Sequence, residues 1–150
     1  MKHLAILLFI GIAASAAIAG ESRTPEQLVT QYTNACAKGQ LDQAFALFYQ
    51  NGTPDFIVEF TKSDLQNDIT NRVIVSAVIR DIPKEKKDKW VKGYPYQGKT
   101  LVPNLEPLKE MEVEFKGTDG KETDVDASQI MIGKVGKAHY FILSKVKETE

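Results

Sequence analysis

Three aromatic side chains stand close together in one segment, Trp90-Val-Lys-Gly-Tyr94-Pro-Tyr96-Gln-Gly98, among glycines and lysines. Aromatic rings bind peptides, sugars and protein partners well, because they bring a large contact area and lose little conformational freedom. Residues 83–108 around them are polar and rich in proline, and we expect a long connection or an extended hairpin there. Trp90, Tyr94 and Tyr96 are therefore candidate ligand- or partner-binding residues. The alternative is that the rings pack back on the domain and pin this connection.

The remaining reactive side chains form no recognisable catalytic motif. His139 is the only histidine beyond His3, so a Ser–His–Asp triad or a metal site would have to draw on it alone. We expect His139 on a strand surface, and we expect neither a metal site nor a cofactor. Cys36 is the only cysteine, and its helical spacing predicts a buried free thiol on an apolar helix face. A Gly-rich phosphate loop is also missing from the sequence.

The first residues have the three-part layout of a secretion signal. A positive start (Met1-Lys2-His3) precedes a short apolar run, which ends in small residues and Ala17-Ile18-Ala19. The uncharged run is shorter than the roughly 20 residues that a membrane-spanning helix needs. We expect residues 1–19 to be a signal peptide cleaved after Ala19, and residues 20–150 to be a periplasmic or secreted protein without a membrane span.

Length and charge narrow the classes of protein further. The chain of 150 residues has a formal net charge of −1. Residues 20–150 suit one domain with one core. A nearly neutral chain without a basic stripe gives no reason to expect nucleic acid as a partner.

The first half of the sequence predicts helices. Thr24-Pro25-Glu26-Gln27 is a capping box that opens a helix with an apolar face, and Gly39 ends that helix. A second helix is expected from Leu41 to just before Asn51-Gly52, with Phe48 on its apolar side. A third is expected near 63–71, because Ser63-Asp64-Leu65-Gln66 is another capping box. Residues 55–60 stay unassigned, and the β-branched residues after 72 favour a strand near 73–82.

The second half predicts antiparallel strands. Met111, Val113 and Phe115 alternate with charged residues, which is typical of a half-buried strand. Turns are expected at Asp119-Gly120 and at residues 133–136, and a last strand is expected over residues 139–146. The expected architecture is α+β, with N-terminal helices that cover one face of an antiparallel sheet.

The helix pair "LVTQYTNACAKGQLDQAFALF" and the closing "IGKVGKAHYFIL" resemble the first two helices and the last hairpin of the NTF2-like (cystatin-like) superfamily. In particular, the turn Gly39-Gln40-Leu41-Asp42 joins the two helices as it does in that superfamily. The resemblance implies a curved sheet around a pocket, formed with the helices. Its members include enzymes, binding modules and secreted bacterial proteins, so the fold does not settle the function.

The resemblance also brings in a catalytic alternative. In the ketosteroid-isomerase branch, a tyrosine seven residues before the turn glycine donates a hydrogen bond to an oxyanion, and Tyr32 matches that position. Asp55 is the nearest candidate base, although Phe56 rather than proline follows it. The opposing interpretation makes Tyr32 a core tyrosine.

Three functions stay open at this point. We expect a non-enzymatic binding or interaction protein of the bacterial envelope, with an unknown small molecule or an envelope protein as its partner. The first alternative is a small isomerase or dehydratase that uses Tyr32. The second is an inhibitor or immunity-type protein that acts by occlusion. Dimerisation through the sheet is common in the superfamily, and the sequence leaves a homodimer open.

Overall fold

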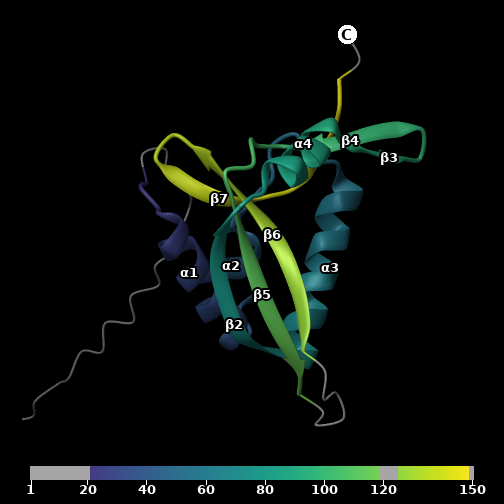
Figure 1. Cartoon of the computed structure of the whole chain (residues 1–150). Helices are drawn as coiled ribbons and strands as arrows, with labels where there is room; N and C mark the ends of the chain where they lie inside the picture. The colour runs from purple at the N-terminus through teal and green to yellow at the C-terminus, as the bar shows by residue number, and fades with distance from the viewer. Residues whose placement is uncertain (1–20, 119–124, 149–150) are drawn as a thin grey trace, which may run out of the picture.

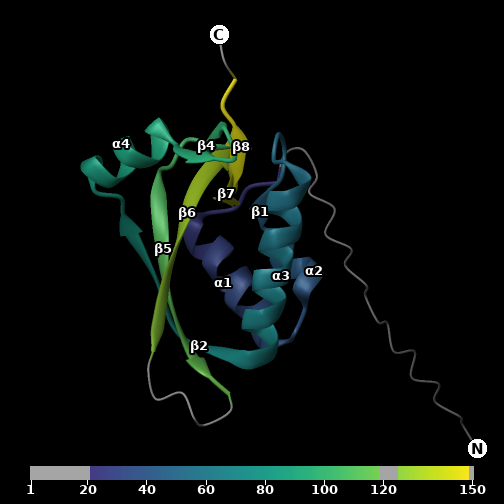
Figure 2. The ribbon, with the colours of Figure 1, turned by 90° about the vertical axis from the view of Figure 1, so that its right-hand side faces the viewer.

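A computed structural model describes residues 21–118 and 125–148. The described chain is α+β, with three of its helices packed on one face of a curved sheet that does not close into a barrel (Figures 1 and 2). The α+β expectation is therefore confirmed. The expected signal peptide and the turn at Asp119-Gly120 lie outside the described residues. Within the described ranges, no helix is long and apolar enough to cross a membrane.

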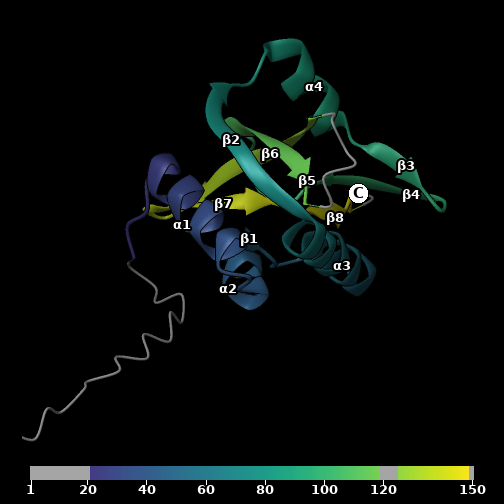
Figure 3. The same ribbon diagram turned by 90° about the horizontal axis from the view of Figure 1, so that it is seen from below.

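The helices are α1 (Pro25–Ala37), α2 (Leu41–Phe45), α3 (Asp55–Asn71) and α4 (Lys84–Lys92). The strands are β1 (Phe48–Tyr49), β2 (Arg72–Asp81), β3 (Tyr94–Tyr96), β4 (Lys99–Pro103), β5 (Lys109–Gly117), β6 (Asp126–Val135), β7 (Ala138–Ile142) and β8 (Ser144–Val146). Helices α1, α2 and α3 lie on one side of the sheet and α4 lies on the other (Figure 3).

The predicted capping box at the start of α1 is confirmed. Thr24 accepts a hydrogen bond from the Gln27 backbone, and the Gln27 side chain accepts one from the Thr24 backbone. The face predicted from helical spacing faces the core, since Leu28, Val29 and Tyr32 are buried. The same core cluster includes residues of β5, β6 and β7, namely Met111, Val113, Phe115, Ile132 and Phe141.

The larger sheet has the strand order β1-β7-β6-β5-β2. Its long strands β2, β5, β6 and β7 are antiparallel, whereas β1 pairs parallel with β7. The sheet is therefore mixed rather than wholly antiparallel. The expected strand near 73–82 is confirmed as β2, which pairs with β5 along its length.

A smaller sheet has the order β3-β4-β8 and lies at one end of the larger one (Figure 1). The expected last strand is divided at Leu143 into β7 and β8, one for each sheet. Asn104 fixes this division. Its backbone N–H donates to the Leu143 carbonyl at 2.8 Å, and its side-chain oxygen accepts from the Leu143 N–H at 3.1 Å.

Two helix predictions were wrong. Ser63 does not open α3, because the helix already begins at Asp55 after Pro54. The residues left unassigned continue the apolar stripe of α3, since Ile57 and Val58 pack on the core with Leu65. The second helix ends at Phe45, and Phe48 lies in β1, paired with Phe141.

The expected long connection at residues 83–108 contains a helix and a hairpin. Its charged run forms α4, which Pro83 precedes and Gly93 ends with a φ of 85°. The expected turn at residues 133–136 is also shorter, because β6 continues to Val135. Gly133 is buried in that strand, and a Cβ there would lie 2.7 Å from the Cβ of Leu105, so the position favours glycine because of close packing.

Candidate functional site

Tyr94 and Tyr96, predicted as binding residues, lie on β3 with exposed side chains. Their exposed fractions are 49% and 39%. They are two residues apart on a strand, so they point to the same face of the hairpin. Tyr96 stacks on Phe56 of α3, with ring centroids 5.2 Å apart and an interplanar angle of 10°. Tyr94 lies near Ser144 of β8, with its hydroxyl 3.2 Å from the serine Oγ.

Phe56 and Phe60 extend this group of rings along α3. Their exposed fractions are 40% and 69%. Residues four apart lie on the same side of a helix, so Phe60 is the next ring after Phe56 on that side. Phe56, Phe60, Tyr94 and Tyr96 together form a surface that we call the aromatic surface. The β3–β4 hairpin lies beside the N-terminal end of α3 in Figure 1, which brings the two halves of this surface together.

The free edge of β3 has no backbone N–H at Pro95 to donate to a further strand. Gln97 and Gly98 both have positive φ values and form the two-residue turn between Tyr96 and Lys99. In such a hairpin the residues that flank the turn direct their backbone groups at the partner strand, so Pro95 faces the free edge. Proline has no N–H to donate there. The missing donor makes strand addition less favourable at β3, so the rings are the main groups that β3 offers to a ligand.

Trp90 is not part of the aromatic surface, although the sequence grouped it with Tyr94 and Tyr96. It lies in α4, is half-buried, and has the Lys86 ammonium 4.8 Å from its ring centroid. Lys86 also forms an ion pair with buried Glu110 of β5, at 2.5 Å. Trp90 thus lies beside the contact that holds α4 against the outer face of the sheet.

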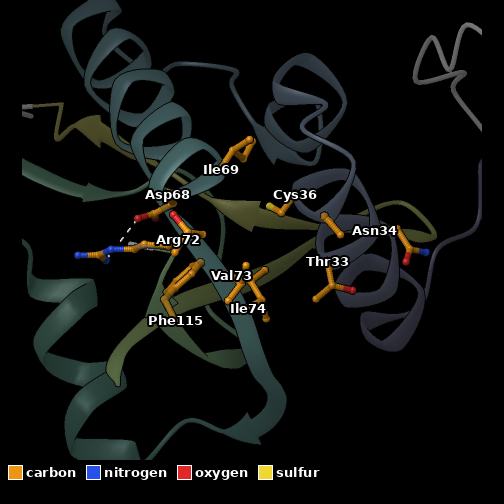
Figure 4. Close-up of a pocket in the computed structure, with 11 residues that line it drawn as sticks. Thr33, Asn34, Cys36, Asp68, Ile69, Arg72, Val73, Ile74 and Phe115 are labelled. Carbon is orange, nitrogen blue, oxygen red and sulfur yellow. Dashed lines mark ion pairs between the residues drawn. The ribbon is translucent and has the colours of Figure 1, made fainter. Parts of the chain in front are cut away.

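A cleft of about 450 Å³ opens between α1, α3 and the start of β2 (Figure 4). We call it the α1–α3 cleft. One part of its wall is apolar and the other part carries polar or charged groups. Its lining residues are Thr33, Asn34, Cys36, Ala37, Asp68, Ile69, Arg72, Val73, Ile74, Phe115 and Thr118.

Asp68 is the acidic residue that lines the cleft. Burial and the nearby charge of Asp64 raise the pKa of Asp68, while Arg72 acts in the opposite direction. The Arg72 guanidinium lies 3.4 Å from Asp68 and 3.2 Å from Asp126. The Arg72 guanidinium therefore forms ion pairs with two carboxylates.

Cys36 is a free thiol that is partly buried and lines the cleft, rather than being fully buried as predicted. Burial raises its pKa to about 11, although a hydrogen bond from the Tyr32 hydroxyl lowers it. Tyr32 itself is 1% exposed and its ring packs edge-on against Phe141. Burial raises the pKa of the Tyr32 hydroxyl, so it stays protonated. The lining of the cleft does not include Tyr32.

The structure does not bring Tyr32 and Asp55 together. Asp55 is exposed in the first turn of α3, whereas the carboxylates that act on the Tyr32 hydroxyl are Asp68 and Asp64. Asp64 lies roughly 14 Å further along the helix than Asp55, at about 1.5 Å per residue. Asp55 is therefore not the carboxylate that lies nearest to Tyr32 along α3.

His139 has a local structural role. Its N–H donates to the Arg23 carbonyl at 3.0 Å, and its ring Nδ1 lies 2.8 Å from the same oxygen. Among the residues that the structure describes, no group of three or more His, Cys, Asp or Glu is placed to hold a metal ion.

Sequence reasoning missed Phe56, Phe60 and Asp68. The two phenylalanines stood in the segment left unassigned, and their spacing of four residues was the signal for a shared helix side. Asp68 and Cys36 come from different helices, so only the packing of α1 on α3 places them in one cleft. Comparisons with family models, curated proteins and solved structures found no match to this chain.

Proposed function

We propose that this chain is a non-enzymatic binding or interaction protein of the bacterial envelope, built on an NTF2-like α+β domain. The observation that carries the proposal is the aromatic surface: four exposed rings from β3 and α3, two of them stacked on each other. Exposed aromatic clusters are typical of binding surfaces, because each ring buries a large area at a small entropic cost. The signal-like layout of residues 1–19 supports the envelope location.

The stacking of Tyr96 on Phe56 adds to this argument. Because the two stacked rings already restrict each other's motion, they lose less conformational freedom when a ligand covers them. Pro95 on the free edge supports recognition by side chains rather than by strand addition. A ligand or partner with planar or apolar groups is thus the kind that this surface fits.

The geometry gives less support to the isomerase-type alternative. That chemistry needs a neutral donor and a carboxylate that both reach the substrate. Tyr32 is enclosed in the core and Asp55 lies elsewhere on α3. An inhibitor or immunity-type role is a special case of the proposal, in which the captured partner is a protein whose active site is covered.

Capture from an envelope extract tests the proposal. The immobilised protein is compared with the Tyr94→Ala and Tyr96→Ala variants, after circular dichroism has shown that all of them fold. We expect a saturable component that the wild type retains and both variants lose. Equal retention by all three proteins would remove the aromatic surface from the proposal.

A further inference from the structure

The α1–α3 cleft has the size and the wall of a small-molecule site. Its volume of about 450 Å³ lies in the usual range for such sites. Ile69, Ile74 and Phe115 give it an apolar wall, and Figure 4 shows Asp68 and Arg72 beside that wall. This site is separate from the aromatic surface, which lies at the other end of α3.

Asp68 and Arg72 are the charged residues that line the cleft, and two further carboxylates, Asp64 and Asp126, act on this pair from outside the lining. Arg72 lies against Asp68 and Asp126, and Asp64 adds a further carboxylate whose charge acts on Asp68. Arg72 is therefore shared between two carboxylates, so it does not fully neutralise the charge of Asp68.

The ends of α1 and α3 also carry charge near the cleft. The last turns of α1 and α3 both line the cleft, through Cys36 and Ala37 on one side and Asp68 and Ile69 on the other. Helix C-termini carry partial negative charge and favour cations. Neither helix has a basic residue in its last turn, but a cation follows each helix directly as its C-cap residue, Lys38 after α1 and Arg72 after α3. These two cations offset the partial charges of the helix ends, so the preference for a positive group comes from the Asp68 carboxylate.

We propose that the α1–α3 cleft binds a small hydrophobic amine. The ammonium group donates to the Asp68 carboxylate, and the apolar body lies against Ile69, Ile74 and Phe115. An anionic ligand would meet the Asp68 carboxylate, and the cation that lines the cleft, Arg72, is already in contact with two carboxylates. A neutral ligand would contact the apolar wall, but it would give the Asp68 carboxylate no cation besides Arg72 to pair with.

Cys36 supplies a direct measurement, since it is the only cysteine of the chain and lines the cleft. Iodoacetamide alkylation of the purified protein is followed by mass spectrometry in mildly alkaline buffer. The three probes are 2-phenylethylamine, 2-phenylethanol and 3-phenylpropionate, which share a phenyl body and differ in charge. We expect the amine to slow the alkylation of Cys36 in a saturable manner. The alcohol should act only at higher concentration, and the carboxylate should not act.

Two variants on α3 test whether Asp68 is the residue that binds the amine. Asp68→Asn should weaken protection by the amine about tenfold, because a charge-assisted hydrogen bond is replaced by a neutral one. Asp55→Asn is the matched control on the same helix, outside the cleft, and should protect like the wild type. Absence of protection, equal protection by all three probes, or unchanged protection in Asp68→Asn would each overturn the proposal. Tyr96→Ala should leave the protection intact, so this test does not depend on the function proposed for the aromatic surface.

Discussion

The ring of Tyr96 lies flat against the ring of Phe56, with centroids 5.2 Å apart and planes at 10°. This contact joins the β3–β4 hairpin to the first turn of α3. Offset-stacked aromatic pairs contribute beyond the area that they bury. The aromatic surface is thus held together by an interaction within the protein, before any ligand arrives.

A double-mutant cycle measures that interaction. We expect Phe56→Ala and Tyr96→Ala to be coupled by about 0.5–1.5 kcal/mol in the free energy of unfolding. Urea denaturation of the wild type, both single variants and the double variant gives the coupling energy. Strictly additive effects would show that the two rings do not stabilise each other in solution.

The attachment of α4 to the sheet gives a second prediction. Lys86 pairs with Glu110, which is buried, whereas the neighbouring Lys87 pairs with the exposed Glu106. Lys86→Ala should cost about 1–3 kcal/mol of unfolding free energy, since it leaves a buried carboxylate without its cation. Lys87→Ala, the matched control, should change it by less than about 0.5 kcal/mol. Similar values for the two variants in urea denaturation would contradict this account of α4.

Gly93 sets the entry into the hairpin. Its φ is 85°, and a Cβ there would lie 2.4 Å from the Leu101 carbonyl oxygen. Gly93→Ala should therefore cost more than about 2 kcal/mol, because backbone strain and a clash act together.

Gly98 is the matched control for Gly93. It also has a positive φ, of 76°, but a Cβ there would meet nothing within 4 Å. Gly98→Ala should therefore cost only about 1 kcal/mol, the strain alone. Thermal denaturation of both variants separates the two contributions, and an equal loss at the two positions would rule out the clash.

The pKa of Asp68 leads to a pH-dependent prediction. Burial and then Asp64 raise this pKa in the folded state, with Arg72 opposing them. A carboxyl whose folded pKa exceeds the unfolded value favours folding while it is protonated, and this contribution is lost as the pH rises through the folded pKa. At neutral pH, Asp68→Asn should thus be more stable than the wild type, by less than about 1 kcal/mol because the site is partly exposed.

The difference between Asp68→Asn and the wild type should shrink as the pH falls and Asp68 takes up its proton. Urea denaturation of both proteins at neutral and acidic pH measures it. A wild type that is the more stable protein at neutral pH would show that the ion pair with Arg72 outweighs burial.

Local sequence signals predicted the elements that depend on local interactions. The capping box at Thr24 and the apolar face of α1 were visible because they involve neighbouring residues. The alternation along β5 was visible for the same reason. Phe48 was assigned to a helix because its pairing with Phe141 is a long-range contact that periodicity does not contain.

The candidate site was predictable only in part. Tyr94 and Tyr96 were found from their type and spacing, but Phe56 joins them only through the docking of the hairpin on α3. Asp68 became a candidate only once α1 and α3 enclosed a cleft with Cys36. Trp90 was grouped with the tyrosines because it is near them in sequence, whereas the turn at Gly93 places it on another element.

The binding account depends most directly on Phe60, the most exposed ring of the aromatic surface. The measurement is the affinity of the captured ligand or partner for Phe60→Ala, by calorimetry. Val78→Ala, which shortens an exposed apolar residue on the outer face of the sheet, is the control. The account predicts that Phe60→Ala weakens binding by at least about tenfold while Val78→Ala does not, because a few aromatic residues carry most of the binding energy of an interface. Equal affinity of Phe60→Ala and the wild type would contradict it.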